Sequence, residues 1–329
     1  MSDLRPVLRT SLAELFPGAR QETLVADAST RRFHRLFLSD GGTRIVMDYG
    51  SAFEGETDDV RLARVFGQAG LPVARVLHIL PEAGALVVED LGDETLETAL
   101  SRATSAARPS RDDLYRSAVR LAAEIATRGT AALSHSERAQ GPALDNDRFL
   151  FEMRFFLEHY VVGFLGRSQS TEVREAVEAL ALTAASHPRV LCHRDYHSRN
   201  IMVREDGSLA MVDIQDARWG PDTYDLASLL CDAYVDLGDR EAAELFDLYV
   251  GQIPGSPEPE GLRRRFEVVA AQRMLKALGT FGYQISALGR ERYRSAIPRT
   301  VERLARFLPQ SAQTAPLGEV LLREGLLTN

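Results

Sequence analysis

The sequence predicts an α+β fold in which a small antiparallel sheet precedes a larger, mainly helical region. Two patterns lead to this prediction. Short alternating runs separated by turn residues fill the first 89 residues, and helical periodicity dominates the remainder. The length of 329 residues and an apolar content of 45 % are sufficient for each region to have a core. We therefore expect a division into residues 1–89 and residues 90–329.

The first region should open with a helix over residues 3–16, which Pro17 and Gly18 end. A second helix is expected over 54–68, where acidic residues crowd the first turn. The turn Ser39-Asp40-Gly41-Gly42 predicts a hairpin. The expected strands of the sheet are 24–26, 33–38, 44–47, 75–80 and 85–89.

The second region shows apolar residues at helical spacing along most of its length. A stretch rich in Pro and Gly, 252–261, reads as a surface connection. The expected helices are 95–101, 112–128, 147–165, 172–186, 226–237, 240–251, 262–278, 290–307 and 317–326.

Composition restricts the class of partner. The formal net charge of −8 lacks the basic character that nucleic acid or an anionic membrane surface requires, so we expect a small-molecule partner. The sequence has no apolar run of about 18 residues and no apolar signal-peptide core, which favours a cytoplasmic protein. No obligate protein partner is inferred.

The stretch from Cys192 to Asp225 carries the chemistry. It contains His193-Arg194-Asp195, then Asn200, and then Asp213 at the end of a predicted hairpin over 201–212. Transfer of a phosphoryl group from ATP requires a group that accepts or orients the attacking hydroxyl, together with oxygen ligands for Mg²⁺. We expect Asp195 to take the first role, and Asn200 and Asp213 to bind the metal.

The motif H-R-D-x-x-x-x-N followed by an Asp at a strand end resembles the catalytic and metal loops of protein kinases. The tract D-x-H-x-x-N over Asp195–Asn200 more closely resembles the aminoglycoside phosphotransferase family of small-molecule kinases. The segments Asp213-Ile214-Gln215-Asp216 and Gly220 to Ala227 agree with that family. The resemblance implies a protein-kinase-like fold of two lobes, with a hinge at 87–92 and with ATP and Mg²⁺ as cofactors.

The resemblance also implies the nucleotide site. The turn containing Ser29 and Thr30 either covers the ATP phosphates or is an ordinary hairpin turn, since it has no glycine. Glu89 and Leu91 either contact the adenine edge or form a strand end followed by a cap. The expected nucleotide-binding residues are Ser29, Thr30, Arg32, Glu89, Leu91, Asn200 and Asp213.

One expected residue of the nucleotide site is missing. Protein kinases carry a phosphate-binding Lys on the third strand, where this sequence has Met47, and the single lysine of the chain is Lys276. Either an arginine such as Arg32, Arg35 or Arg44 replaces it, or backbone groups and Mg²⁺ suffice. Glu54 or Glu56 either pairs with that arginine or belongs to a solvated helix start.

Candidates for the acceptor site come from three segments. Glu152 and Arg154 lie on a helix that borders the acceptor pocket in the family, although each alone favours a surface position. Arg273 and Lys276 either bind an anionic substrate group or form a solvated basic helix end. Gln215 and Asp216 are expected to face the acceptor, and His193 and Asp225 to support the catalytic loop.

Four segments resemble the bacterial cell-wall amino-sugar kinases within this family, namely Asp213 to Ala217, the loop Asp27 to Phe33, the strand Ile45 to Asp48 and the tract Arg273 to Lys276. Those enzymes phosphorylate the anomeric hydroxyl of N-acetylmuramate and N-acetylglucosamine in peptidoglycan recycling, and this is the function expected here. One alternative is a kinase for another hydroxyl compound, such as an aminoglycoside, whose positive charge would suit the net charge of −8. The other is a nucleotide-binding module without catalysis, which the missing strand Lys would explain.

Overall fold

The computed structural model describes residues 4–24, 31–102, 109–134, 143–253, 255 and 258–327. The chain divides into two compact units, of which the first comprises residues 1–94 and 202–215 and the second comprises 95–201 and 216–329. Residues 202–215, which contain most of the hairpin of the catalytic stretch, thus pack in the first unit. The predicted division of the sequence at residue 89 instead assigned them to the second region.

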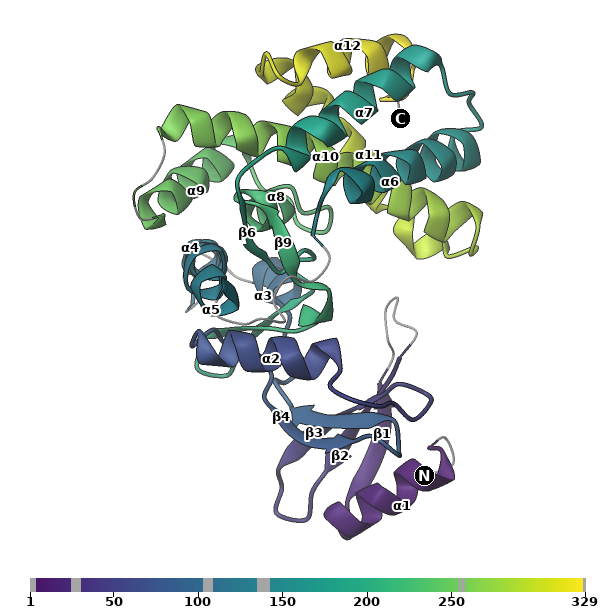
Figure 1. The fold of residues 1–329 in the computed structure, drawn as a ribbon, viewed down its shortest axis with the longest axis vertical. Coiled ribbons are helices and arrows are strands. Elements are labelled where there is room, and N and C mark those ends of the chain that lie inside the picture. The colour runs from purple at the N-terminus through teal and green to yellow at the C-terminus, as the bar shows by residue number, and fades with distance from the viewer. Residues whose placement is uncertain are drawn as a thin grey trace. The chain divides into compact units, whose positions relative to one another are not determined.

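The first unit is built on an antiparallel sheet with the strand order β1-β2-β3-β5-β4 (Figure 1). The turn between β2 and β3 is stabilised by Asp40, whose carboxylate accepts a hydrogen bond from Gly42 N, while Gly41 adopts a φ of +86°. The strands are β1 (Arg20–Leu24), β2 (Arg32–Phe37), β3 (Thr43–Asp48), β4 (Val76–Leu80) and β5 (Ala85–Glu89). The first strand begins earlier than predicted, and the predicted continuation at 25–26 lies outside the described residues.

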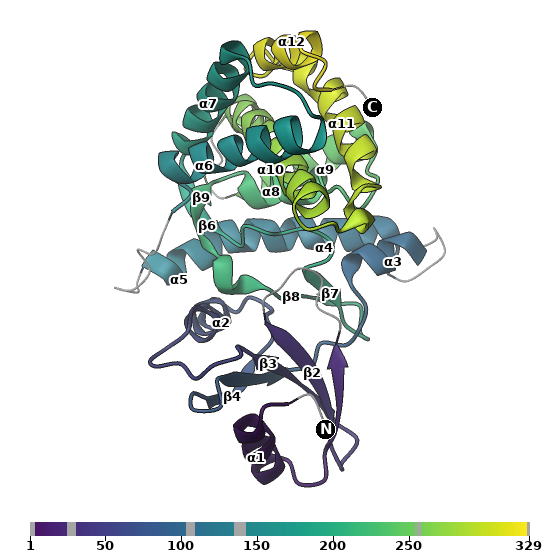
Figure 2. The same ribbon diagram turned by 90° about the vertical axis from the view of Figure 1, so that its right-hand side faces the viewer.

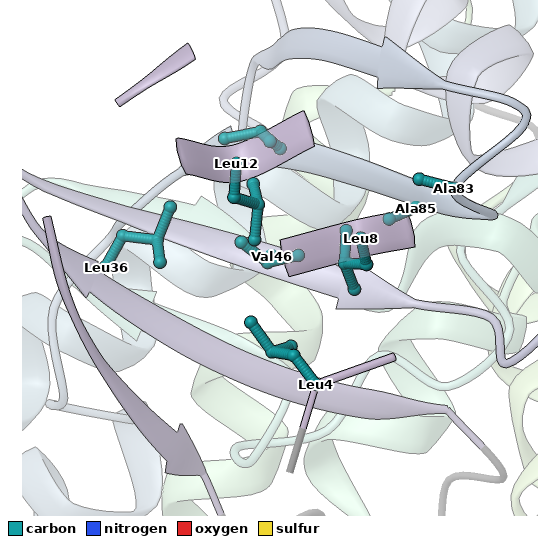
Figure 3. Close-up of a cluster of buried hydrophobic side chains, with 8 residues drawn as sticks. Leu4, Leu8, Leu12, Leu36, Val46, Ala83 and Ala85 are labelled. Carbon is teal, nitrogen blue, oxygen red and sulfur yellow. The ribbon is translucent and has the colours of Figure 1, made fainter. Parts of the chain in front are cut away.

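Helix α1 (Pro6–Leu15) covers one face of this sheet. Leu4, Leu8 and Leu12 point toward the strands and form a buried cluster with Leu36, Val46, Ala83, Ala85 and Val87 (Figure 3). Because side chains alternate between the two faces of a strand, the position of Leu36 and Val46 in this cluster assigns every residue of β2 and β3 to a face.

Helix α2 (Asp58–Gln68) starts later than the sequence suggested. Thr57 is its N-cap and accepts a hydrogen bond from Val60 N, while Gly55 has a φ of +74° that excludes it from a helix. The hairpin of β7 (Ile201–Val203) and β8 (Leu209–Met211) forms as predicted. Met211 N donates to Pro72 O, which fastens this hairpin to the segment before β4.

The second unit is mainly helical (Figure 2). Its two strands, β6 (Arg189–Cys192) and β9 (Arg218–Pro221), pair antiparallel. Its helices are α3 (Leu96–Arg102), α4 (Arg111–Glu124), η1 (Ile125–Gly129), α5 (Thr130–Ser134), α6 (Asn146–Phe156), η2 (Leu157–Phe164), α7 (Thr171–Ala185), α8 (Tyr224–Leu230), α9 (Asp239–Gln252), α10 (Pro259–Ser286), η4 (Glu291–Tyr293), α11 (Ala296–Phe307), η5 (Leu308–Gln310) and α12 (Ala315–Arg323). The short helix η3 (Ile214–Asp216) follows β8, and its first two residues belong to the first unit.

Helix α10 is the centre of this unit and packs against α6, η2, α8 and α11 (Figure 2). The prediction that it ends at residue 278 was wrong. Gly279 and Gly282 are helical, and a Cβ at either position would lie 2.8 Å from Phe156 Cα or 2.4 Å from His159 O. These glycines therefore allow close approach of α6 and η2, and they do not stop the helix.

Helix α8 is shorter than predicted and ends at Leu230. The reason is Asp232, whose carboxylate accepts hydrogen bonds from Ser198 N and Tyr234 N and so holds the chain in a non-helical path. The helix predicted over 290–307 likewise begins only at Ala296, after the short turn η4. Among the described residues, no helix has the length and apolar character needed to span a membrane.

Candidate active site

The loop 193–200 is held in place by carboxylates that follow it in the sequence. Asp225, in the first turn of α8, accepts hydrogen bonds from His193 N at 2.7 Å and Arg194 N at 3.0 Å, as the sequence predicted. Asp232 accepts from Ser198 N at 2.8 Å. Both carboxylates are buried, and each satisfies backbone donors that the loop cannot pair internally. The loop backbone is therefore fixed before any substrate binds.

Backbone strain marks the same stretch. Among the described residues, the non-glycine residues with positive φ are Arg194, at +79°, and Asp213, at +62°. Such a conformation costs about 1–3 kcal/mol and persists only where its surroundings enforce it. Asp225 and the Arg194 side chain, which pairs with Asp216 at 2.8 Å, supply that constraint in the catalytic loop.

Asp195 lies between cations from α10. Its Oδ1 is 3.1 Å from Lys276 Nζ and 3.8 Å from Arg273 Nη1, and its side chain remains 29 % exposed. Burial raises the pKa of Asp195, but the charges of Lys276, Arg273 and Arg194 outweigh this effect and hold the pKa well below its usual range. The carboxylate is thus ionised and oriented, and it is a weak base.

Glu152 is the second carboxylate of this environment. Its side chain is only 3 % exposed, so the surface position that the sequence favoured was wrong. It accepts a hydrogen bond from Gln272 Nε2 at 2.8 Å, and it lies 3.9 Å from Lys276 Nζ and 3.8 Å from Arg194 Nη2. Arg154, two residues further along α6, instead pairs with Glu178 and is 66 % exposed. The structure therefore separates two residues that the sequence treated together.

Arg273 and Lys276 are not a solvated helix end, because α10 continues beyond them and their side chains are 11 % and 15 % exposed. Arg273 donates to Tyr224 Oη at 2.9 Å and stacks over the Tyr224 ring at 4.9 Å. Burial, reinforced by the charge of Arg273, lowers the pKa of Lys276 to about 8, against the opposing effects of Asp195 and Glu152.

These side chains form one connected set, which we call the ion-pair network. Its links are contacts of 4.0 Å or less between oppositely charged groups, and its members are Arg148, Glu152, Arg194, Asp195, Asp216, Arg218, Arg273 and Lys276. Five cations and three carboxylates give these described residues an excess of positive charge. The sign is opposite to the net charge of the chain.

The predicted metal ligands offer oxygen donors. Asn200 Nδ2 donates to Asp195 O at 2.9 Å, which fixes the amide and leaves its oxygen as the atom available to a cation. Asp213 is exposed and belongs to the first unit, where Gln215 Nε2 donates to its Oδ1 at 2.6 Å. The described residues hold no group of three His, Cys, Asp or Glu side chains that could bind a metal. An amide and a carboxylate oxygen fit Mg²⁺, which takes few protein ligands and completes its shell with phosphate and water.

The predicted nucleotide-binding residues of the first unit do not form a connected set of contacts among the described residues. Ser29 and Thr30 lie outside the described residues. The carboxylate of Glu89 accepts a hydrogen bond from Arg75 Nε at 3.1 Å, and the backbone N–H of Glu89 donates to Arg75 O. Leu91 is half-buried, directly after Asp90, the partner of Arg35. Arg32 is exposed, and Glu56, which precedes α2, pairs with Arg64 of that helix.

Two features of the site were missed by the sequence interpretation. The first is Asp232, which holds Ser198. The second is the ion pair between Arg31 and Asp59, at 2.9 Å, in the first unit. Neither belongs to a recognisable motif, and the only available signal was an acidic residue inside a predicted helix.

The pattern that describes the phosphotransferase enzyme family matches residues 21–263, which include every part of the catalytic stretch. The chain belongs to this family. The resemblance inferred from Asp195, Asn200 and Asp213 is thereby confirmed, and this member of the family is a phosphotransferase enzyme.

Two curated relatives in this family are similar along nearly all of the chain. A protein from Neisseria meningitidis serogroup B is 30 % identical over 306 residues, covering 90 % of this chain and 88 % of the relative. A protein from Pseudomonas aeruginosa is 29 % identical over 320 residues, covering 94 % and 88 %. Both are named N-acetylmuramate/N-acetylglucosamine kinase.

Solved structures of similar fold include choline kinase LicA from Streptococcus pneumoniae, with a TM-score of 0.59 and 15 % identity, covering 90 % of this chain and 98 % of that one. The ADP-bound aminoglycoside phosphotransferase APH(2'')-Ib matches with a TM-score of 0.55 and 14 % identity, covering 96 % and 99 %. At these identities the likeness concerns the fold alone. It confirms the predicted α+β fold of protein-kinase type, with an antiparallel sheet and a mainly helical remainder.

Proposed function

We propose that this phosphotransferase catalyses the ATP-dependent phosphorylation of the anomeric hydroxyl of N-acetylmuramate and N-acetylglucosamine, as a step of peptidoglycan recycling in the cytoplasm. The names of the curated relatives support this substrate pair. The structural observation that carries the proposal is the ion-pair network, in which Asp195 is held ionised by Lys276 beside buried groups able to bind a polar acceptor.

The charge of the network favours one acceptor class over the other. Its positive excess suits an acceptor that carries a carboxylate, as N-acetylmuramate does. A polycationic aminoglycoside would need an acidic environment, and the net charge of −8 that made this alternative attractive is not the charge around Asp195. The amino sugars are therefore the better supported acceptors.

Several buried polar atoms near Asp195 have no hydrogen-bond partner in the described structure. They include Arg194 Nε, Gln272 Oε1 and Arg273 Nε. Such atoms are costly to bury alone, and a sugar offers hydroxyl and amide groups that can satisfy both donors and acceptors. We take them as the groups that recognise the sugar.

The low pKa of Asp195 bears on its role. A carboxylate held ionised by Lys276 accepts a hydrogen bond from the acceptor hydroxyl and directs its oxygen toward the phosphoryl group. Because phosphoryl transfer passes through a loose transition state, early removal of the proton contributes little, and orientation contributes most. Asp195 then receives the proton as the new bond to phosphorus forms.

Asn200 and Asp213 are the residues that would hold Mg²⁺ on the phosphates of ATP. When bound, the metal neutralises the negative charge of the phosphate oxygens. Asp225, by fixing His193 N and Arg194 N, keeps Asp195 and Asn200 in register on the loop. No nucleic acid, membrane or obligate protein partner is part of this proposal.

The test is an assay of ATP consumption with N-acetylmuramate, N-acetylglucosamine and a panel of aminoglycosides. Phosphorus NMR of the product should locate the phosphate on the anomeric oxygen of each sugar. Phosphate on the 6-hydroxyl, or turnover with aminoglycosides alone, would overturn the proposal. ATP binding without phosphorylation of any acceptor would instead support the nucleotide-binding module.

A further inference from the structure

The missing lysine of β3 leaves open which cation of the first unit binds the phosphates of ATP, and strand alternation narrows the choice. Leu36 and Val46 face α1, so Arg32 of β2 and Arg44 of β3, which share their alternation, lie on the same side of the sheet. Arg44 is also directly opposite Leu36. Met47, at the expected position of the lysine, lies on the other face, paired with Phe33 and Leu86.

Arg35 lies on the same face as Met47, but its guanidinium is bound to two carboxylates. Its Nε and Nη2 donate to the Asp90 carboxylate at 2.6 and 3.1 Å, and its Nη1 lies 2.7 Å from Asp93 Oδ1. Two carboxylates neutralise its charge, and the fork geometry of the guanidinium is used on Asp90. Arg35 therefore serves to hold the segment after β5.

Arg31 directly precedes β2 and shares the alternation of Phe33 and Arg35, which places it on the face of Met47. Its Nη1 donates to Asp59 Oδ1 at 2.9 Å, and its guanidinium lies over the Tyr49 ring at 4.8 Å. The other carboxylate oxygen of Asp59 accepts a hydrogen bond from Tyr49 Oη at 2.6 Å. Asp59 is buried in the first turn of α2, so both of its oxygens are fixed.

A cation on this sheet face, held by a carboxylate from the helix that follows β3, reproduces the pairing by which protein kinases position their phosphate-binding lysine. We propose that Arg31, positioned by Asp59 and Tyr49, is the residue of the first unit that binds the phosphates of ATP. The inference rests on the proposed use of ATP. A guanidinium suits this role because its planar donors match phosphate oxygens and its charge does not titrate.

The experiment measures binding of ATP, ADP and adenosine by calorimetry to the full chain and to four variants. Arg31→Met should weaken ATP and ADP binding by roughly tenfold to a hundredfold, because a charge-assisted contact is lost. Its affinity for adenosine should be unchanged. The matched control Arg32→Met removes a neighbouring positive charge on the α1 side of the sheet, so it should leave all three affinities unchanged, contrary to the expectation from the sequence that Arg32 binds the nucleotide. Arg35→Met tests the other arginine on the face of Met47. Arg31→Gln keeps a donor for Asp59 and tests the same point if Arg31→Met does not fold.

Asp59 is assigned a positioning role, which a double-mutant cycle can test. Asp59→Asn should weaken ADP binding in the wild-type background and have no further effect once Arg31 is replaced. A purely structural role would lower adenosine affinity as well, and it would persist in the Arg31→Met background.

The outcomes separate the inference from the proposed function. If the wild-type chain binds neither ATP nor ADP, the proposed function fails. If it binds both and Arg31→Met binds them equally well, the assignment of Arg31 is wrong. Equal losses for ADP and adenosine would also overturn it, and so would a phosphate-selective loss in Arg35→Met with none in Arg31→Met.

Discussion

At the scale of single residues, the proposed chemistry of the second unit depends on the pair of Asp195 and Lys276. Their 3.1 Å contact joins a carboxylate of lowered pKa to an ammonium group whose pKa is also lowered, because the ammonium is buried beside Arg273. The same lysine contacts Glu152, so its charge balances two carboxylates. Replacement of either member of the pair should therefore lower the rate of catalysis.

Replacement of Asp195 by Asn should lower kcat by roughly 10²- to 10⁴-fold, the usual range for loss of a proton-accepting group. The amide cannot receive the hydroxyl proton, while the binding residues of ATP are untouched. Steady-state kinetics and ADP calorimetry on the same preparation check this expectation. An unchanged kcat would exclude Asp195 from the reaction.

Activity should decline above about pH 8, where Lys276 loses its proton. Below this pH the lysine is charged and holds Asp195, whereas above it the ion pair is lost and the positive excess of the network falls. The charged groups that face Lys276 are Glu152 of α6, Arg194 and Asp195 of the loop, and Arg273 of α10.

The measurement is kcat/KM for N-acetylmuramate from pH 6 to pH 9.5. An arginine does not titrate in this range, so Lys276→Arg should lack the basic limb even if its maximal rate is lower. A basic limb that persists unchanged in Lys276→Arg would assign the titration to another group.

At the scale of elements, the length of α10 decides where the cations stand. Had the helix ended at residue 278, Arg273 and Lys276 would lie in its last turns, next to solvent. The close approach of Phe156 and His159 to Gly279 and Gly282 instead buries this part of the helix against α6 and η2. Glu152 of α6 is thereby brought to Gln272 and Lys276 of α10.

Gly282→Ala should destabilise the protein by about 1–3 kcal/mol, because the added Cβ would lie 2.4 Å from His159 O and the two helices must separate. The change should also raise KM for the sugar, since Lys276 moves with α10. Gly261→Ala is the matched control in the first turn of the same helix, where the nearest atom is a flexible Arg265 side-chain nitrogen at 3.7 Å. Thermal unfolding should show a lower Tm for Gly282→Ala only.

At the scale of the whole molecule, the net charge of the chain and the local charge around Asp195 have opposite signs. The chain carries a net charge of −8, yet the ion-pair network around Asp195 has an excess of cations. Net charge therefore does not describe the charge that surrounds Asp195. Arg148 and Arg154 of the same helix make the distinction testable, because only Arg148 belongs to the network.

Arg148→Gln should raise KM for N-acetylmuramate roughly three- to tenfold, equivalent to about 1 kcal/mol, with a smaller effect on uncharged N-acetylglucosamine. Arg148 is 33 % exposed, so a neutral replacement should be tolerated by the fold. Arg154→Gln removes the same charge from the exposed partner of Glu178 and should change neither KM. Equal effects of Arg148→Gln on both sugars would show that the network does not discriminate by charge.

Much of this architecture could be predicted from the sequence because the signals are local. Turn residues and two-residue alternation mark the strands of the sheet, and the spacing of Asp195, Asn200 and Asp213 identifies the catalytic stretch. Hydrogen bonding of Asp225 to the loop was also predictable, since an acidic residue at a helix start accepts backbone donors. Boundaries failed at Thr57 and Leu230, where side-chain hydrogen bonds override periodicity.

The sequence by itself determined the α+β class and the family, and it nominated Asp195 as the catalytic residue, because each inference uses residues that are close together along the chain. Only the tertiary structure decided which residues face Asp195 and which carboxylates pair with Arg31 and Arg35 on the side of Met47. Lys276 is 81 positions from Asp195, and Asp59 is 28 from Arg31. Such partners are brought together by the packing of α10 against α6 and by the face of the strand on which a residue lies. These long-range contacts leave no periodic signal in the sequence.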